Sequence, residues 1–262
     1  MTADAPGSLG TRPPSTRSGL RAEVLLVLAL SLGQSAIYAM VSITAKLTAG
    51  RPLSQQTATL NPSQSPRPYL DLTYQLLGIA FALVPVLLAV HLLKRDRSDT
   101  APSLGLDLRR PGADTGWGAA LAAGIGLPGL LLVYAAAALG LNARIVPAAL
   151  NPVWWAVPVL ILAAIQNAVL EEVIVVGYLV TRLRDLAWRT PVIIAASAVL
   201  RGSYHLYQGF GAFVGNAVMG VVFALFFLRT KRVLPLIIAH SLLDIVAFVG
   251  YTLLPKDWLT WL

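Results

Sequence analysis

The chain alternates long apolar runs with short polar stretches, and the apolar runs predict helices rather than strands. Seven runs can be drawn, at about 24–45, 72–93, 117–141, 153–183, 191–204, 213–228 and 233–254. A helix needs roughly 20 apolar residues to cross a bilayer. The run 153–183 exceeds that length, whereas 191–204 falls short of it. The pattern therefore predicts an all-α, polytopic transmembrane helix bundle of about seven spans.

Composition supports a membrane protein with one bundle. Only 12% of the 262 residues are charged, against about 25% in soluble domains, and no polar stretch is long enough for a second, soluble domain. Residues 1–20 are rich in Ser, Thr, Pro and Gly and are expected to form a disordered cytoplasmic tail. Residues 21–262 are expected to form the bundle, with an uncleaved first span.

The positive charges predict an orientation and exclude one class of partner. Most Lys and Arg residues lie at the ends of alternate apolar runs, so the positive-inside rule puts the N-terminus in the cytoplasm and the C-terminus outside. The net charge of +8 comes without a basic stripe or interleaved aromatic residues, and we expect no nucleic-acid partner. Cysteine is absent, which excludes disulfides, Cys-ligated zinc and a thiol nucleophile.

Five ionisable residues interrupt the apolar runs and are the candidate catalytic residues. They are Glu171, Glu172, His205, His240 and Asp244. A charged side chain at mid-bilayer depth costs about 2.5–3.5 kcal/mol even on the lenient insertion scale. Such residues must pair, line a wet cavity or do chemistry. A single buried histidine is usually a hydrogen-bonded core residue, but the whole set favours a shared hydrolytic site in which carboxylates and imidazoles activate water.

Helix geometry assigns provisional roles within this set. His240 and Asp244 are four residues apart and share one helical face. Glu171 and Glu172 lie about 100° apart on their helix, so one is expected to be the working base. We favour Glu171, because Asn167 continues its face, and expect its carboxylate to lie within about 8 Å of His240.

Glu172 is then expected to be the supporting residue. Its expected partner is Tyr204 or Arg201. Two adjacent carboxylates in a dry bundle repel each other, so a hydrogen-bonding or cationic partner is needed.

The order of these motifs resembles the CPBP family, which contains the membrane-embedded CAAX prenyl endopeptidases and bacterial relatives linked to bacteriocin processing and immunity. The matching stretches are Leu170–Leu179, Ser203–Gly209 and Ala239–Asp244, and the resemblance covers about 153–250. It implies an intramembrane endopeptidase of the bacterial cell membrane that cleaves a membrane-associated or lipidated peptide or protein. Glu171 or Glu172 would activate water with His205, while His240 and Asp244 would stabilise the oxyanion or position the water.

Two positions depart from the family pattern, and the cofactor stays open. The family's first motif is usually Glu-Glu-x-x-x-Arg, but Val176 stands where the arginine would fall, and Asp244 stands where the last motif often has Asn. Two imidazoles and a carboxylate could ligate zinc. A glutamate can equally act without metal as general base, and we slightly prefer that hypothesis.

Two other functions remain compatible with the same residues. A non-enzymatic immunity or scaffolding protein would bind a partner through its helices. An ion or proton transporter would also use buried carboxylates, but the sequence shows neither an inverted repeat nor paired broken helices. The peptidase is therefore the leading hypothesis.

Overall fold

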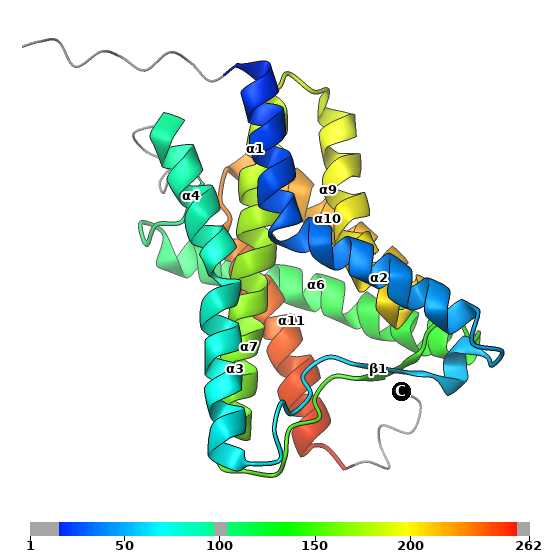
Figure 1. The fold of residues 1–262 in the computed structure, drawn as a ribbon. Coiled ribbons are helices and arrows are strands. Elements are labelled where there is room, and N and C mark those ends of the chain that lie inside the picture. Colours follow the sequence, from blue (N-terminus) through cyan, green and yellow to red (C-terminus); the bar gives the residue numbers. More distant parts are fainter. Residues whose placement is uncertain (1–15, 97–103, 256–262) are drawn as a thin grey trace, which may run out of the picture.

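The computed structural model describes residues 16–96 and 104–255, and these form a bundle of helices with a very small sheet (Figure 1). The elements are α1 (Arg17–Ala29), α2 (Leu32–Leu47), η1 (Leu53–Gln55), β1 (Thr57–Thr59), α3 (Pro68–Ala82), α4 (Val84–Asp96), α6 (Pro111–Ala138), β2 (Arg144–Val146), α7 (Ala156–Glu171), η2 (Glu172–Tyr178), α8 (Leu179–Asp185), α9 (Thr190–His205), η3 (Leu206–Gln208), α10 (Phe210–Thr230) and α11 (Leu234–Leu253). The all-α membrane bundle expected from the sequence is confirmed.

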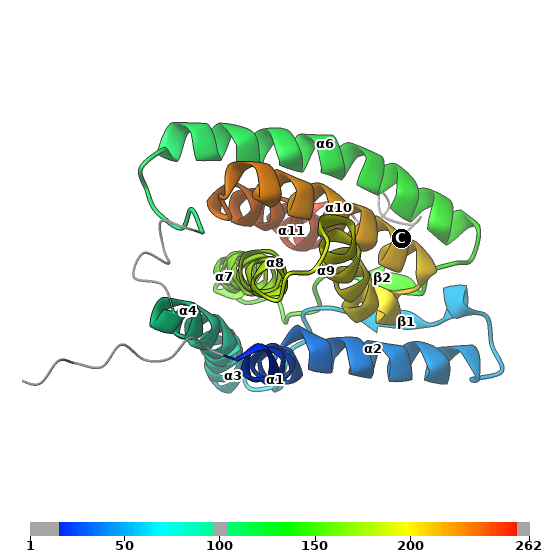
Figure 2. The ribbon, with the colours of Figure 1, turned by 90° about the horizontal axis from the view of Figure 1, so that it is seen from above.

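One continuous helical rod, α7–η2–α8, forms the centre of the bundle. Viewed from above, the other helices surround it, with α6 outermost on one side (Figure 2). In its most apolar window 67% of the residues are buried, against 6% for α6. The rod that carries both glutamates is therefore shielded from lipid by its neighbours.

The number of long spans is slightly lower than the sequence predicts. All seven apolar runs are helical, but within the described residues five helical stretches are long and apolar enough to cross a bilayer, with α3 and α4 counted as one. The number is six if α1 and α2 also count together. These two helices meet at a bend of 54°. The remaining helix, α9, has 16 residues, which at about 1.5 Å each cannot cross a hydrocarbon core of about 30 Å.

The bend between α1 and α2 depends on a small residue. The carbonyl of Leu28 lies so near Gly33 that a Cβ there would approach the oxygen to 2.7 Å. The hydroxyl of Ser31 donates to the carbonyl of Val27 at 2.6 Å, because the bend leaves that carbonyl without a helical partner. The first helix begins at Arg17, so residues 17–20 of the expected tail are helical, and residues 1–15 lie outside the described part.

A parallel pair of three-residue strands, β1 and β2, joins two loops that are distant in sequence. The sequence analysis predicted no strand here, since three residues are too few to show a period. Just before β2, Asn142 accepts hydrogen bonds from the backbone N–H groups of Gly211 and Ala212 at the start of α10. Gly209 precedes this start with φ +127°, and a Cβ there would lie 2.5 Å from Asn142. These contacts hold the turn between η3 and α10 next to the candidate site.

Two arginines tie the helix ends together, one of them deep in the bundle. Arg182 is 1% exposed and pairs with Glu23 at 2.8 Å and Asp96 at 2.8 Å, which links α8 to α1 and α4. Arg232 pairs with Asp114 at 2.6 Å and Asp107 at 3.2 Å. The backbone N–H of Arg109, together with the Arg232 guanidinium, lowers the pKa of Asp107.

Candidate active site

The central rod changes from α-helix to π-helix between the two glutamates. Glu171 ends α7, and Glu172 opens η2, whose hydrogen bonds run from i to i+5. A π-turn leaves some carbonyls without their usual partner, and the hydroxyl of Ser197 on α9 donates to the carbonyl of Val175 at 3.2 Å. The β-branched residues of η2 weaken the α-helix locally, which is the one sequence signal that could have pointed to the π-segment.

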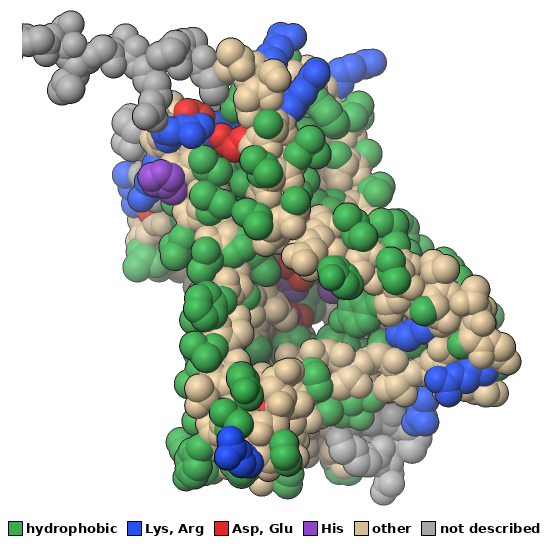
Figure 3. Space-filling model, viewed as in Figure 1, with side chains coloured by type: hydrophobic (Ala, Val, Ile, Leu, Met, Phe, Trp, Pro, Cys, Tyr) green, Lys and Arg blue, Asp and Glu red, His purple; other side chains and the backbone are tan. Residues whose placement is uncertain are grey.

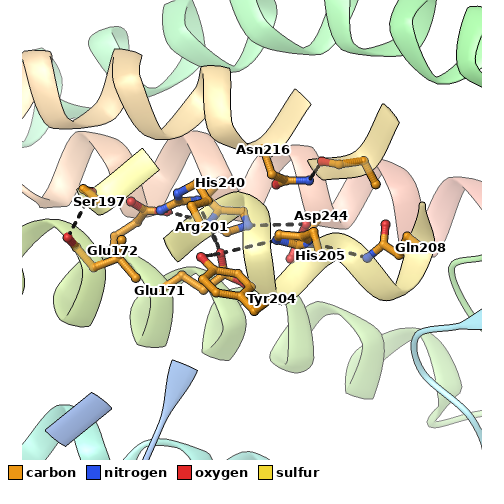
Figure 4. A network of polar contacts seen from close by, with 12 residues as sticks. Glu171, Glu172, Ser197, Arg201, Tyr204, His205, Gln208, Asn216, His240 and Asp244 are labelled. Atoms are coloured by element: carbon orange, nitrogen blue, oxygen red, sulfur yellow. Dashed lines mark hydrogen bonds and ion pairs between the residues drawn. The ribbon is translucent and has the colours of Figure 1, made fainter. Parts of the chain in front are cut away.

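Glu172 is completely enclosed and has two partners on one oxygen. Its Oε1 accepts from Arg201 Nη2 at 2.7 Å and lies 2.7 Å from His240 Nδ1. Its Oε2 is buried with no hydrogen-bond partner among the described residues. Glu172 is therefore fixed by a guanidinium and an imidazole and cannot reach solvent (Figure 4).

Glu171 points to the same cluster but is partly open. Its Oε2 accepts from the Tyr204 hydroxyl at 2.7 Å and from Arg201 Nη1 at 3.3 Å. His205 Nε2 lies 3.8 Å from this oxygen and His240 Nδ1 lies 4.0 Å from it. The Glu171 side chain keeps 10% exposure, whereas that of Glu172 has none.

His205 is oriented by a residue that the sequence analysis did not single out. The Gln208 amide lies 3.2 Å from His205 Nδ1 and also donates to the Tyr207 hydroxyl at 3.0 Å. With the amide donating to Nδ1, a neutral His205 carries its proton on Nε2. This atom faces Glu171 and is buried without a partner among the described residues. Gln208 lies three residues after His205, beyond the end of α9. A sequence pattern does not predict a side-chain contact at such a position.

His240 lies between two carboxylates. Its Nδ1 faces Glu172, and its Nε2 lies 3.6 Å from Asp244 Oδ1, one turn further along α11. The His240 side chain is 4% exposed, but that of Asp244 is 21% exposed. The i, i+4 pair expected from the sequence thus faces the glutamates, with Asp244 at the more open end.

The structure brings all five candidate residues into one cluster, with two differences in their partners. Tyr204, one of the two partners expected for Glu172, bonds to Glu171 instead. Asn167, expected to hold Glu171, interacts with Asp244. Arg201, the other expected partner of Glu172, contacts both glutamates.

Arg201 provides the positive charge that the first motif lacks. Val176, at the position of the family's usual arginine, is fully buried. Arg201 reaches the glutamates from α9, is 0% exposed, and lies over the ring of Phe223 at 5.3 Å. A planar guanidinium can bond to two carboxylates at once, so this one side chain reduces the repulsion between Glu171 and Glu172.

The cluster opens on one side into a hollow below α2. Acidic and histidine side chains are visible in its floor, between α3 and the β1 segment (Figure 3). A cavity of about 470 Å3 lies between α2 and the residues around His205. Its walls are mostly polar or aromatic side chains, namely Gln34, Ser35, Tyr38 and Ser42 on one side and Tyr204 and Tyr207 on the other.

Three side chains in the cluster could hold a metal ion. The nearest donor atoms of Glu171, Glu172 and His240 all lie within 4.8 Å of one another, and three protein ligands are the usual number at a catalytic zinc. However, the Arg201 guanidinium already lies against both carboxylates. A cation in that position competes with a metal for the same oxygens.

Residues 153–246 match the family model described as Rce1-like, a type II CAAX prenyl endopeptidase. Over this segment the chain is similar to the CAAX protease family. The match contains the whole cluster and begins just before α7. No curated protein and no solved structure matches the chain.

The CAAX protease match confirms the family expected from the motif order. It also agrees with the geometry, because α7, η2, α9 and α11, which supply the five candidate residues, all fall mainly inside the matched range. The helices α1 to α6, which include the α2 wall of the cavity, lie outside it.

Proposed function

We propose that this protein is an intramembrane endopeptidase that hydrolyses a peptide bond of a membrane-associated or lipidated substrate. The observation that carries the proposal is that the partly exposed carboxylate of Glu171 lies 3.8 Å from the Nε2 atom of His205. The two side chains keep 10% and 18% exposure, and Tyr204, which bonds to Glu171, lines the adjacent cavity. A purely structural cluster would have no need of this opening.

In the proposed reaction Glu171 is the general base. Its carboxylate takes a proton from a water molecule as the hydroxide adds to the scissile carbonyl carbon. The Nε2–H of His205 donates a hydrogen bond to the carbonyl oxygen as negative charge develops there. Glu171 then passes the proton to the departing amine, so the carbon–nitrogen bond breaks and the carboxylate is restored.

The other residues of the cluster position these two. Glu172 contacts the Nδ1 atom of His240, and Asp244 faces the Nε2 atom of the same ring. Tyr204 and Arg201 fix Oε2 of Glu171, so its other oxygen is left for water. Positioning of this kind is required, because displacements of about 1 Å can reduce turnover a hundredfold.

The function is tested with a farnesylated peptide that ends in a CAAX sequence, and with the same peptide lacking the lipid. We expect the purified protein to cleave the lipidated form, with the new peptide ends identified by mass spectrometry. As a test free of substrate choice, membrane-protein N-termini should differ between cells with wild-type protein and cells with Glu171→Gln. If neither assay shows cleavage, an immunity or scaffolding role becomes the better explanation.

We propose that catalysis does not require a metal. Glu171, Glu172 and His240 could supply three zinc ligands, but Arg201 already bonds to both carboxylates. We expect purified, active protein to contain substoichiometric zinc by plasma mass spectrometry, and 1,10-phenanthroline to leave cleavage unchanged. Stoichiometric zinc whose removal stops cleavage, and whose return restores it, would show that the metal is needed.

We propose that the N-terminus is cytoplasmic and the C-terminus is outside. The basic residues at alternate helix ends support this orientation, and α1 begins at the opposite end of the bundle from the end of α11 (Figure 1). A phosphatase reporter, which is active only outside the cytoplasm, should be active when fused after Leu262. An inactive phosphatase at this position, together with an active cytoplasmic reporter fused at the same place, would reverse the assignment.

A further inference from the structure

The cavity beside the cluster is bounded by a stripe of polar side chains on α2. Gln34, Ser35, Tyr38 and Ser42 follow one another at helical spacing and share one face of α2. None of their side chains has a hydrogen-bond partner within residues 16–96 and 104–255. In a bilayer an unpaired polar group is costly, so this stripe needs a polar occupant.

The opposite wall connects the cavity directly to the candidate base. Tyr204 lines the cavity and donates its hydroxyl hydrogen to Glu171 at 2.7 Å. Tyr207 lines it as well and bonds to Gln208, which orients His205. A molecule in the cavity therefore lies against the tyrosine that holds the base and against the tyrosine bonded to Gln208.

The cavity is large enough to bind a short stretch of polypeptide. Its volume of about 470 Å3 falls within the range of about 300–1,000 Å3 that is usual for ligand sites. From Gln34 to Ser42 the stripe runs about 12 Å along the helix. That length matches three or four residues of extended chain at about 3.3 Å each.

We propose that this cavity, which we call the α2 groove, binds the segment of the substrate polypeptide next to the cleaved bond. The stripe of α2 donates and accepts hydrogen bonds to the substrate backbone, and Tyr204 and Tyr207 pack against its side chains. The inference rests on the proposed peptidase function. It assigns substrate binding to a helix outside the segment that matches the family model.

The test uses the absence of cysteine from the chain. Ser35→Cys and Ser42→Cys each place a single thiol in the groove. Thr44→Cys is the matched control, because Thr44 is exposed and lies about 200° around α2 from Ser42. The three variants are made in the Glu171→Gln background, which is expected to bind the peptide without cleaving it, and each is first shown to be folded by size-exclusion chromatography.

The rate of modification by methyl methanethiosulfonate is then measured in detergent, with and without the farnesylated CAAX peptide. We expect both groove cysteines to react, and the peptide to slow their reaction about tenfold at ten times its Kd. The rate at Thr44→Cys should not change. Failure of the reagent to reach Ser35→Cys or Ser42→Cys would show that the groove is closed, and equal protection at all three positions would show that the peptide shields the protein non-specifically.

Parallel cleavage assays on the protein with Glu171 intact separate this inference from the function. Cleavage of the peptide without protection of the groove cysteines would overturn the groove and leave the peptidase in place. Protection without cleavage would support the groove as a peptide site and overturn the peptidase. Neither cleavage nor protection would overturn both.

Discussion

Replacing Glu171 by glutamine is expected to abolish peptide cleavage and to leave the protein folded. The amide keeps the shape of the side chain but cannot accept a proton from water. It can still accept the hydrogen bonds that Tyr204 and Arg201 donate to Oε2. The measurement is kcat for the farnesylated peptide, with thermal unfolding in detergent recorded alongside it.

Glu172→Gln is the matched comparison, since it makes the same chemical change one residue away. Glu172 is 0% exposed and bonds to Arg201 and His240. Its replacement removes a buried charge that both partners require, so we expect a larger drop in thermal stability and a smaller loss of kcat. Cleavage that survives in Glu171→Gln but disappears in Glu172→Gln would exchange the two roles. Cleavage that survives in both would end the mechanism.

Replacing Arg201 by methionine is expected to destabilise the protein and to stop cleavage. The guanidinium lies between two carboxylates and is 0% exposed, and removal of one partner from a buried ion pair costs about 3–5 kcal/mol. Without it, Glu171 and Glu172 face each other with no arginine between them. The effect is measured as the loss of folded protein on size-exclusion chromatography and as the fall in thermal unfolding temperature.

One further variant separates charge from shape at Arg201, and another serves as a control. Arg201→Lys keeps the positive charge, but an ammonium cannot bridge both carboxylates as a planar guanidinium does. We expect it to restore folding in large part and kcat only weakly. Arg229→Met is the control, since Arg229 is exposed at the end of α10 and its loss should change neither quantity. A fully active Arg201→Met protein would refute the positioning role.

Much of the fold follows from hydrophobic runs, because a span must be apolar over most of its length. That rule located every long helix, but it could not show the bend between α1 and α2. The bend arises from the contact of Gly33 with the Leu28 carbonyl, which is a matter of a single close approach. The pattern of hydrophobic runs also could not show β1 and β2, because these two strands pair across residues that are distant in sequence.

The candidate site could be predicted as a set of residues but not as a set of contacts. The cost of burying Glu171, His240 and Asp244 in lipid was enough to group them. Their partners depend on the rotation of one helix relative to another. Tyr204 therefore reaches Glu171 rather than Glu172, and Gln208 reaches His205 from beyond the end of α9.

The π-segment between Glu172 and Tyr178 also limits how this chain can vary in length. A turn closed from i to i+5 contains one residue more than a turn closed from i to i+4, so deletion of a single residue here can be absorbed by reversion to α-helix. The residues on both sides would then keep their faces toward the bundle. A relative with a one-residue gap between Glu172 and Leu179 would therefore retain both the cluster and the arginine network. The same gap within α7 or α8 would rotate the parts of the helix on its two sides relative to each other.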